Sequence, residues 1–165
     1  MTTTAPAPLA VTRPNTKRFI AIAAATVAVD LGSKIAATAT LDEPLRLGPI
    51  TLRISHNSGV AFGAGNGLPA AVVIAATALV TIVLVVAVLR GHLGTGPGPA
   101  MVTGGAAANV IDRSHNASVV DIIDLGWWPA FNLADTAICI GLALIILTQH
   151  RLPEHNRHID GPADQ

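Results

Sequence analysis

Two aspartates flank a short, largely apolar stretch of the chain in which tryptophan is prominent. The segment DIIDLGWWPAFNLAD, residues 121–135, contains no lysine or arginine to pair with its carboxylates. Asp121 and Asp135 stand at its two ends, with Trp127 and Trp128 between them. Indole side chains favour membrane interfaces. A loop anchored in this way can fold back at such an interface and bring the two carboxylates together.

Carboxylates brought within a few ångströms can do acid–base chemistry, because like charge and partial desolvation raise one pKa and leave one proton shared by the pair. Such a pair can deprotonate water and protonate a departing amide nitrogen without a metal. Asp121 and Asp135 are therefore candidate catalytic residues, with the capping of helix ends as the alternative. Asp124 is interpreted as a solvated loop residue. Asn57 and Asn132 can present donors and acceptors to a peptide backbone.

Other ionisable residues interrupt apolar segments, where a charge at bilayer depth costs at least about 2.5 to 3.5 kcal/mol. Asp30 and Lys34 have the i, i+4 spacing of a pair on one helical face. They can neutralise each other, or Lys34 can offer its ammonium to a substrate. In the sequence NVIDR, Asn109, Asp112 and Arg113 can face one way, and Asp112 can fix Arg113 by a charge-assisted hydrogen bond.

The elements that position these residues are predicted from a composition typical of membrane proteins. The 165 residues are 51% hydrophobic and only 12% charged, and the formal net charge of zero gives no reason to expect a nucleic-acid partner. About 20 apolar residues in a helix cross a hydrocarbon core of about 30 Å. Four segments are predicted to span the membrane, the third being short and rich in Gly and Ala: residues 19–41, 68–89, 99–111 and 131–147.

Basic residues indicate how these spans are oriented. The ends and the middle connection hold Arg13, Lys17, Arg18, Arg90, His92, Arg151 and Arg157, whereas the two opposite loops hold Arg46, Arg53 and Arg113. The positive-inside rule then places both termini in the cytoplasm. Residues 1–16 and 150–165 are predicted to be cytoplasmic tails, the first of them disordered. A signal peptide ending near residues 37–40 is an alternative for the first segment.

The first outer loop and the lone cysteine complete the pattern. The loop contains LRLGPITLRISHNSG, in which apolar residues alternate, and this alternation predicts short strands at the outer membrane face. Cys139 is the only cysteine, so a disulfide framework is excluded, and we interpret it as a small core residue.

Five blocks of sequence occur together in a fixed order. They are DLGSK at residues 30–34, NSGVAFG at 57–63, GGAAANVIDR at 104–113, VVDIID at 119–124 and PAFNLAD at 129–135. In these blocks the chain resembles the lipoprotein signal peptidases, or signal peptidase II family, over about residues 30–141. One block alone is a weak signal, but five blocks with four predicted spans are highly specific.

The resemblance implies an all-α membrane protein with four transmembrane helices and a small extracytoplasmic β-cradle, its peptidase domain covering residues 17–149. It implies an aspartic endopeptidase that removes the signal peptide from diacylglyceryl-modified prolipoproteins, by water-mediated hydrolysis just before the lipidated cysteine. Its active site would lie at the extracytoplasmic face of the bacterial cytoplasmic membrane. The expected partners are prolipoproteins and membrane lipids, and we expect a monomer without cofactor or metal.

By motif position, the catalytic pair of the family falls on Asp121 and Asp135. The resemblance assigns substrate-binding or supporting roles to Asp30, Lys34, Asn57, Gly59, Asn109, Asp112, Arg113 and Asn132. Two departures from the family pattern are Ala108, where a second glycine is usual, and the short segment between the two aspartates. Neither is expected to abolish activity.

Two other mechanisms remain open from the residues themselves. Ser58 near the outer face could act as a nucleophile with Lys34 as its base. Alternatively, the chain could be a small transporter or proton-relay subunit, with a path through Asp30, Lys34, Asp112 and Asp135. Metal-dependent hydrolysis is not favoured, because no H-E-x-x-H or comparable ligand spacing occurs.

Overall fold

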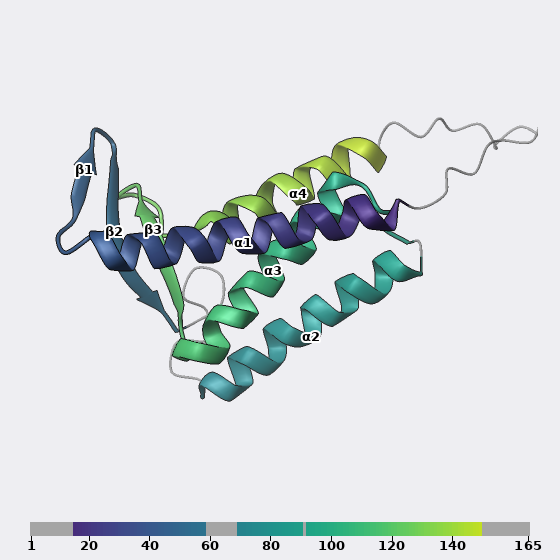
Figure 1. The fold of residues 1–165 in the computed structure, drawn as a ribbon, viewed down its shortest axis with the longest axis horizontal. Helices are drawn as coiled ribbons and strands as arrows, with labels where there is room; N and C mark the ends of the chain where they lie inside the picture. The colour runs from purple at the N-terminus through teal and green to yellow at the C-terminus, as the bar shows by residue number, and fades with distance from the viewer. Residues whose placement is uncertain (1–14, 59–68, 91, 150–165) are drawn as a thin grey trace, which may run out of the picture.

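The computed structural model describes residues 15–58, 69–90 and 92–149. It contains four helices and one small sheet (Figure 1). The helices are α1 (Thr16–Thr40), α2 (Ala70–Leu89), α3 (Pro97–Asn116) and α4 (Leu133–Gln149). The strands are β1 (Leu45–Leu47), β2 (Ile50–Asn57) and β3 (Val119–Asp124). Both predicted tails lie largely outside the described residues, as does Gly59. Asn15 and Thr16 are described, and they begin α1 instead of ending a disordered tail, because the Asn15 side chain accepts from the Arg18 N–H.

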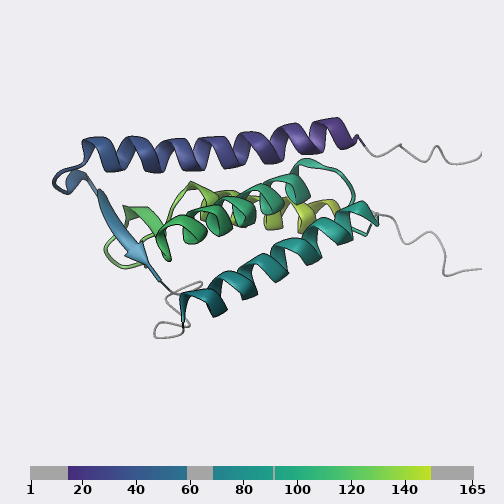
Figure 2. The same ribbon diagram turned by 60° about the horizontal axis from the view of Figure 1, so that its bottom comes forward.

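Helix α3 lies at the centre of the fold, between α1 and α2 and against α4 (Figure 2). Its small residues permit this, because a Cβ added to Gly104 would lie 2.6 Å from the Ala23 carbonyl oxygen of α1. A Cβ on the next residue, Gly105, would lie 2.6 Å from the Ala134 carbonyl oxygen of α4. Ala108 is fully buried on the same helix. The segment 99–111, predicted as the third span, lies within this helix, and its crossing of a membrane stays a prediction.

The helices carry apolar side chains on their outward surfaces. By length and composition, α1 is the one helix among the described residues that could cross a membrane, while Ile74–Leu89 and Leu133–Thr148 are shorter apolar helical stretches. Exposed residues include Val29 on α1 and Leu79 on α2, both about three-fifths accessible. Surfaces of this kind suit an apolar surrounding.

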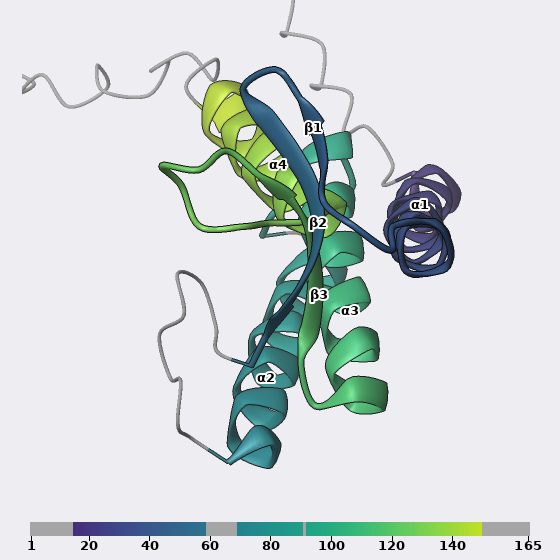
Figure 3. The same cartoon turned by 90° about the vertical axis from the view of Figure 1, so that its left-hand side faces the viewer.

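The sheet covers one end of the helices, opposite the start of α1 and the end of α4 (Figures 1 and 3). Its strands are antiparallel in the order β1-β2-β3. The strands expected in the first outer loop are confirmed as β1 and β2, joined by a turn in which Gly48 has φ of +64°.

Strand β3 was not predicted, and it is the element that carries Asp121. Its register sets Asp121 opposite Ser55 of β2. Val120 and Ile122 pack in a core cluster with Ala37 of α1. The first four residues of β3 are all buried, so the alternation that reveals a half-exposed strand is missing from VVDIID.

Candidate active site

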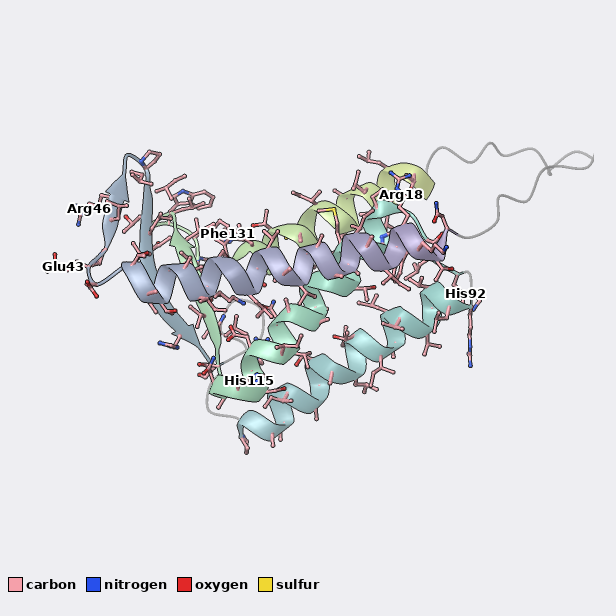
Figure 4. All side chains as sticks on the ribbon, viewed as in Figure 1. Arg18, Glu43, Arg46, His92, His115 and Phe131 are labelled. Carbon is pink, nitrogen blue, oxygen red and sulfur yellow. The ribbon has the colours of Figure 1, made fainter. Side chains whose placement is uncertain are left out.

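Asp121 and Asp135 are brought together by the return of the chain after β3. Phe131 pairs with Ile123 through two backbone hydrogen bonds of 2.9 and 3.0 Å, which closes the loop 124–130 and places the start of α4 beside β3. The predicted folding back of this loop is therefore confirmed. Phe131 lies between the sheet and the first turn of α4 in Figure 4. Both aspartates line one pocket of about 550 Å³.

Amide side chains from three elements hold the two carboxylates. Asp121 accepts a hydrogen bond of 2.7 Å from Asn132 Nδ2 and one of 3.2 Å from Asn57 Nδ2. Asp135 accepts one of 2.9 Å from Asn109 Nδ2. Asn132 Nδ2 also donates to Asn109 Oδ1 at 3.4 Å. Hydrogen bonds through these two amides therefore connect Asp121 with Asp135. The asparagines therefore fix the orientation of both carboxylates.

The first turn of α4 explains why Asp135 stands where it does. Asn132 precedes the helix, and its Oδ1 accepts the Asp135 N–H at 2.9 Å, while Asp135 Oδ2 accepts the Asn132 N–H at 3.4 Å. This reciprocal arrangement is a capping box, which satisfies two backbone donors at the helix start. The sequence Asn-Leu-Ala-Asp thus codes both for the cap and for the site.

Asp121 is a buried residue. Its residue is only 2% exposed, and burial raises the pKa of its carboxyl to about 6, with the negative charge of Asp135 as the second cause. Hydrogen bonds from Asn132 and Asn57 and the charge of Lys34 act against the rise. Burial therefore favours a proton on Asp121.

The raised pKa of Asp121 predicts how activity depends on pH. For a reaction in which Asp121 must carry a proton, we expect kcat/KM to fall as pH rises through about 6, because the Asp121 carboxyl then ionises. The folded protein holds this proton to a higher pH than the unfolded chain does. The stability contributed by Asp121 is therefore complete below its ordinary pKa of 3.8 and is lost as pH rises through about 6. Steady-state rates across this range test the prediction, and a flat profile from about pH 5 to pH 8 would contradict it.

The predicted pair of Asp30 and Lys34 is confirmed, with 2.8 Å between Lys34 Nζ and Asp30 Oδ2. Lys34 Nζ also lies 3.2 Å from Asp112 Oδ2 and 3.4 Å from Asn109 Oδ1. The residue is only 4% exposed. The structure therefore does not favour a Lys34 ammonium offered to a substrate, because protein oxygens already surround it.

Asp112 contacts three groups that the sequence analysis did not predict. Its Oδ2 accepts the Val120 N–H at 2.8 Å besides contacting Lys34, and its Oδ1 accepts from Asn116 at 3.0 Å. The expected hydrogen bond from Arg113 to Asp112 stays a prediction. Arg113 lines the pocket with the two aspartates.

Asp124 is not a free loop residue, contrary to the expectation. It ends β3 and forms an ion pair with Arg53 of β2, and its Oδ1 accepts the Gly126 N–H at 2.7 Å. The Arg53 hydrogen bond lowers the pKa of the Asp124 carboxyl. The sequence analysis did not predict Arg53 as the partner of Asp124, because a basic residue in a polar loop has no local pattern that identifies the acid it contacts. This contact fixes the start of the loop that carries the two tryptophans.

The remaining pocket wall is mostly apolar. Trp127 and Trp128 contact each other edge to face with ring centroids 5.6 Å apart, and both line the pocket. Cys139 also lines it and is exposed, so the interpretation as a core residue was wrong. It lies one helical turn beyond Asp135, on the same side of α4.

The predicted site residues thus form two groups. Asn57, Asn109 and Arg113 line the pocket with the aspartates. The others that the structure describes are buried behind it: Asp30, Lys34, Asp112 and Asn132. The two carboxylates in the pocket, supported by these buried polar residues, can hold a shared proton beside the apolar pocket wall.

Two solved structures share this fold, each described as a bacterial membrane enzyme studied by the in meso method. One, at 1.9 Å resolution, is 25% identical, with a TM-score of 0.71 over 85% of this chain and 97% of that one. The other, at 2.3 Å, is 23% identical, with a TM-score of 0.71 over 90% and 97% of the two chains. Fold and site therefore define a helical membrane enzyme.

Sequence comparison gives the particular family. Residues 22–151 match signal peptidase (SPase) II. A lipoprotein signal peptidase of Rhodococcus jostii is 36% identical over 86% of this chain and 77% of that protein. One of Geobacter metallireducens is 30% identical over 84% and 94% of the two. One of Vibrio vulnificus is 53% identical, but over only 35% of this chain and 37% of its own length. The chain belongs to the signal peptidase II family.

Proposed function

We propose that this protein is an aspartic endopeptidase of the bacterial cytoplasmic membrane that removes the signal peptide from diacylglyceryl-modified prolipoproteins. The observation that carries the proposal is the placement of Asp121 and Asp135 in one pocket, linked through the amides of Asn109 and Asn132. Membership of the signal peptidase II family supports the substrate class.

The proposed reaction uses the two carboxyl groups in different states. Asp135, acting as the base, takes a proton from a water molecule while the water oxygen bonds to the scissile carbonyl carbon. Asp121, protonated in its buried position, gives its proton to the carbonyl oxygen. When the carbon–nitrogen bond breaks, Asp135 passes its proton to the departing nitrogen and Asp121 recovers one from the hydroxyl that becomes the new carboxyl group. Both aspartates then return to their starting states.

The other pocket residues suit a lipidated peptide. Asn57, Asn109 and Arg113 supply polar groups for the signal-peptide backbone, and Trp127 and Trp128 supply an apolar wall for the lipid-bearing residue. Because both aspartates and all these residues belong to one chain, we propose that it acts as a monomer.

The proposed topology has four membrane spans, both termini in the cytoplasm and the sheet on the opposite side. The positions of charged residues support it, since Arg18 and His92 lie at one end of the helices while Glu43 and Arg46 lie at the sheet end (Figure 4). The pocket lies beside the sheet, which would place catalysis at the extracytoplasmic face, where secreted prolipoproteins arrive.

The two alternative mechanisms are less well supported. A serine mechanism needs Lys34 as a base, but Lys34 is buried in contact with Asp30 and Asp112 and is not among the described residues that line the pocket. A proton path would need acidic groups spread through the fold. Instead, Asp30 contacts Lys34 and the start of α4, and the other carboxylates named for this path gather around the same point.

Incubation of the purified full-length protein in detergent with a diacylglyceryl-modified prolipoprotein tests the function. We expect release of the signal peptide, little release from the same precursor without the lipid, and full activity in Ser58→Ala. Loss of release in Ser58→Ala at normal abundance would favour the serine mechanism instead. No release by the wild-type protein would contradict the proposal.

A further inference from the structure

One buried cation lies between two buried carboxylates behind the pocket. Lys34 of α1 contacts Asp30 of the same helix at 2.8 Å and Asp112 of α3 at 3.2 Å. Their exposed fractions are 4%, 1% and 6%. None of the three is among the described residues that line the pocket. Their charges therefore act on the protein itself.

Each of the two carboxylates also holds a backbone N–H beside the pair in the pocket. Asp30 Oδ1 accepts the Ala134 N–H at 2.8 Å, and Ala134 directly precedes Asp135. Asp112 Oδ2 accepts the Val120 N–H at 2.8 Å, and Val120 directly precedes Asp121. The two anchors are thus equivalent: in each case the carboxylate holds the residue one position before a member of the pair.

We propose that Lys34 is a positioning residue that sets the separation of Asp121 and Asp135 by tying together the two carboxylates that anchor their strand and helix. This inference rests on the proposed function, because it takes that pair to be catalytic. It assigns α1 to the catalytic framework, although α1 supplies none of the described residues that line the pocket.

The physical argument concerns what would happen without the cation. Two carboxylates buried near one another repel and are poorly solvated, so one of them would take up a proton or the helices would separate. Either change weakens an anchor, because an ionised carboxylate accepts a hydrogen bond from an N–H more strongly than a neutral one does. Because the ammonium of Lys34 contacts both carboxylates, it offsets their repulsion and gives each buried charge a partner.

A third contact of Lys34 acts on the site more directly. Its Nζ lies 3.4 Å from Asn109 Oδ1, and Nδ2 of the same amide donates to Asp135 at 2.9 Å. An amide has one acceptor end and one donor end, so a cation at the oxygen turns the donor toward Asp135. Lys34 therefore also determines which way this side chain points.

The test compares three full-length variants in the processing assay: Lys34→Met, the triple variant Asp30→Asn/Lys34→Met/Asp112→Asn, and Lys17→Met. The triple variant removes all three charges but keeps an oxygen to accept each backbone N–H. Lys17→Met is the matched control, since Lys17 is an exposed lysine on the same helix. Abundance and thermal unfolding in detergent are recorded for each variant.

We expect Lys34→Met to lower kcat about 100-fold with little change in KM, because small displacements of reacting groups have effects of this size. The triple variant should return to within about tenfold of the wild-type kcat, and Lys17→Met should match the wild type. If Lys34→Met fails to fold, the triple variant still decides the question. Failure of the triple variant to fold would itself overturn the proposal, since its neutral amides should replace the charged set.

Two other results would overturn the inference. One is a wild-type kcat in folded Lys34→Met. The other is a folded triple variant as slow as Lys34→Met, which would mean that the ammonium acts on the substrate. These outcomes differ from failure of the proposed function, which would appear as activity retained after substitution of Asp121 or Asp135 themselves.

Discussion

Asparagine in place of Asp121 or Asp135 should lower the rate of signal-peptide release by about 10⁴-fold, while the protein accumulates to its normal level. Asparagine has nearly the same shape as aspartate, but it cannot take a proton from water or hold one for the carbonyl oxygen. Each substitution removes one of the two groups between which the proton is shared. The measurement is single-turnover release from a diacylglyceryl-modified prolipoprotein.

Asp124→Asn is the matched control for this experiment. Asp124 lies on the same strand, three residues beyond Asp121, and is bound to Arg53 and the Gly126 N–H outside the pocket. We expect it to keep most of the wild-type rate. Release at the wild-type rate by Asp121→Asn or Asp135→Asn would exclude the aspartate mechanism. Reduced abundance alone would indicate a structural role instead.

Asn132→Ala should also have a large effect, because this one side chain serves both aspartates. It donates to Asp121 at 2.7 Å and accepts the Asp135 N–H at 2.9 Å, and the residue is fully buried. Loss of the cap costs about 1 kcal/mol of folding free energy. Loss of the amide donor frees the Asp121 carboxyl to turn, and we expect kcat to fall about 100-fold.

Asn132→Ser separates these two contributions. Serine is a favoured residue before a helix and can accept the Asp135 N–H, but its short side chain has no amide to donate to Asp121. We therefore expect thermal unfolding close to that of the wild type together with a rate as low as that of Asn132→Ala. Recovery of the full rate in Asn132→Ser would show that capping alone accounts for the effect.

Much of the fold could be predicted because its signals are local. The uninterrupted apolar run before Leu89 indicated α2. The alternation of Leu45 with Leu47, and then of Ile50 with Leu52 and Ile54, indicated the first two strands. The Asn-Leu-Ala-Asp segment contained its own helix cap. Strand β3 had no such signal, because residues on both of its faces are buried, with Val120 and Ile122 packed against α1. A strand buried on both faces lacks the alternation of apolar and polar residues.

The sequence by itself determined which residues could do chemistry here: two carboxylates at the ends of an apolar loop, a set of amides, and charges too costly to be accidental inside apolar segments. Only the tertiary structure decided how they are paired. Asp30 meets the Ala134 N–H across 104 positions and Lys34 meets Asn109 across 75. Such contacts depend on how α1, α3 and α4 pack. Spacing along the chain reports the face on which a residue lies, but only packed helices determine what that face meets.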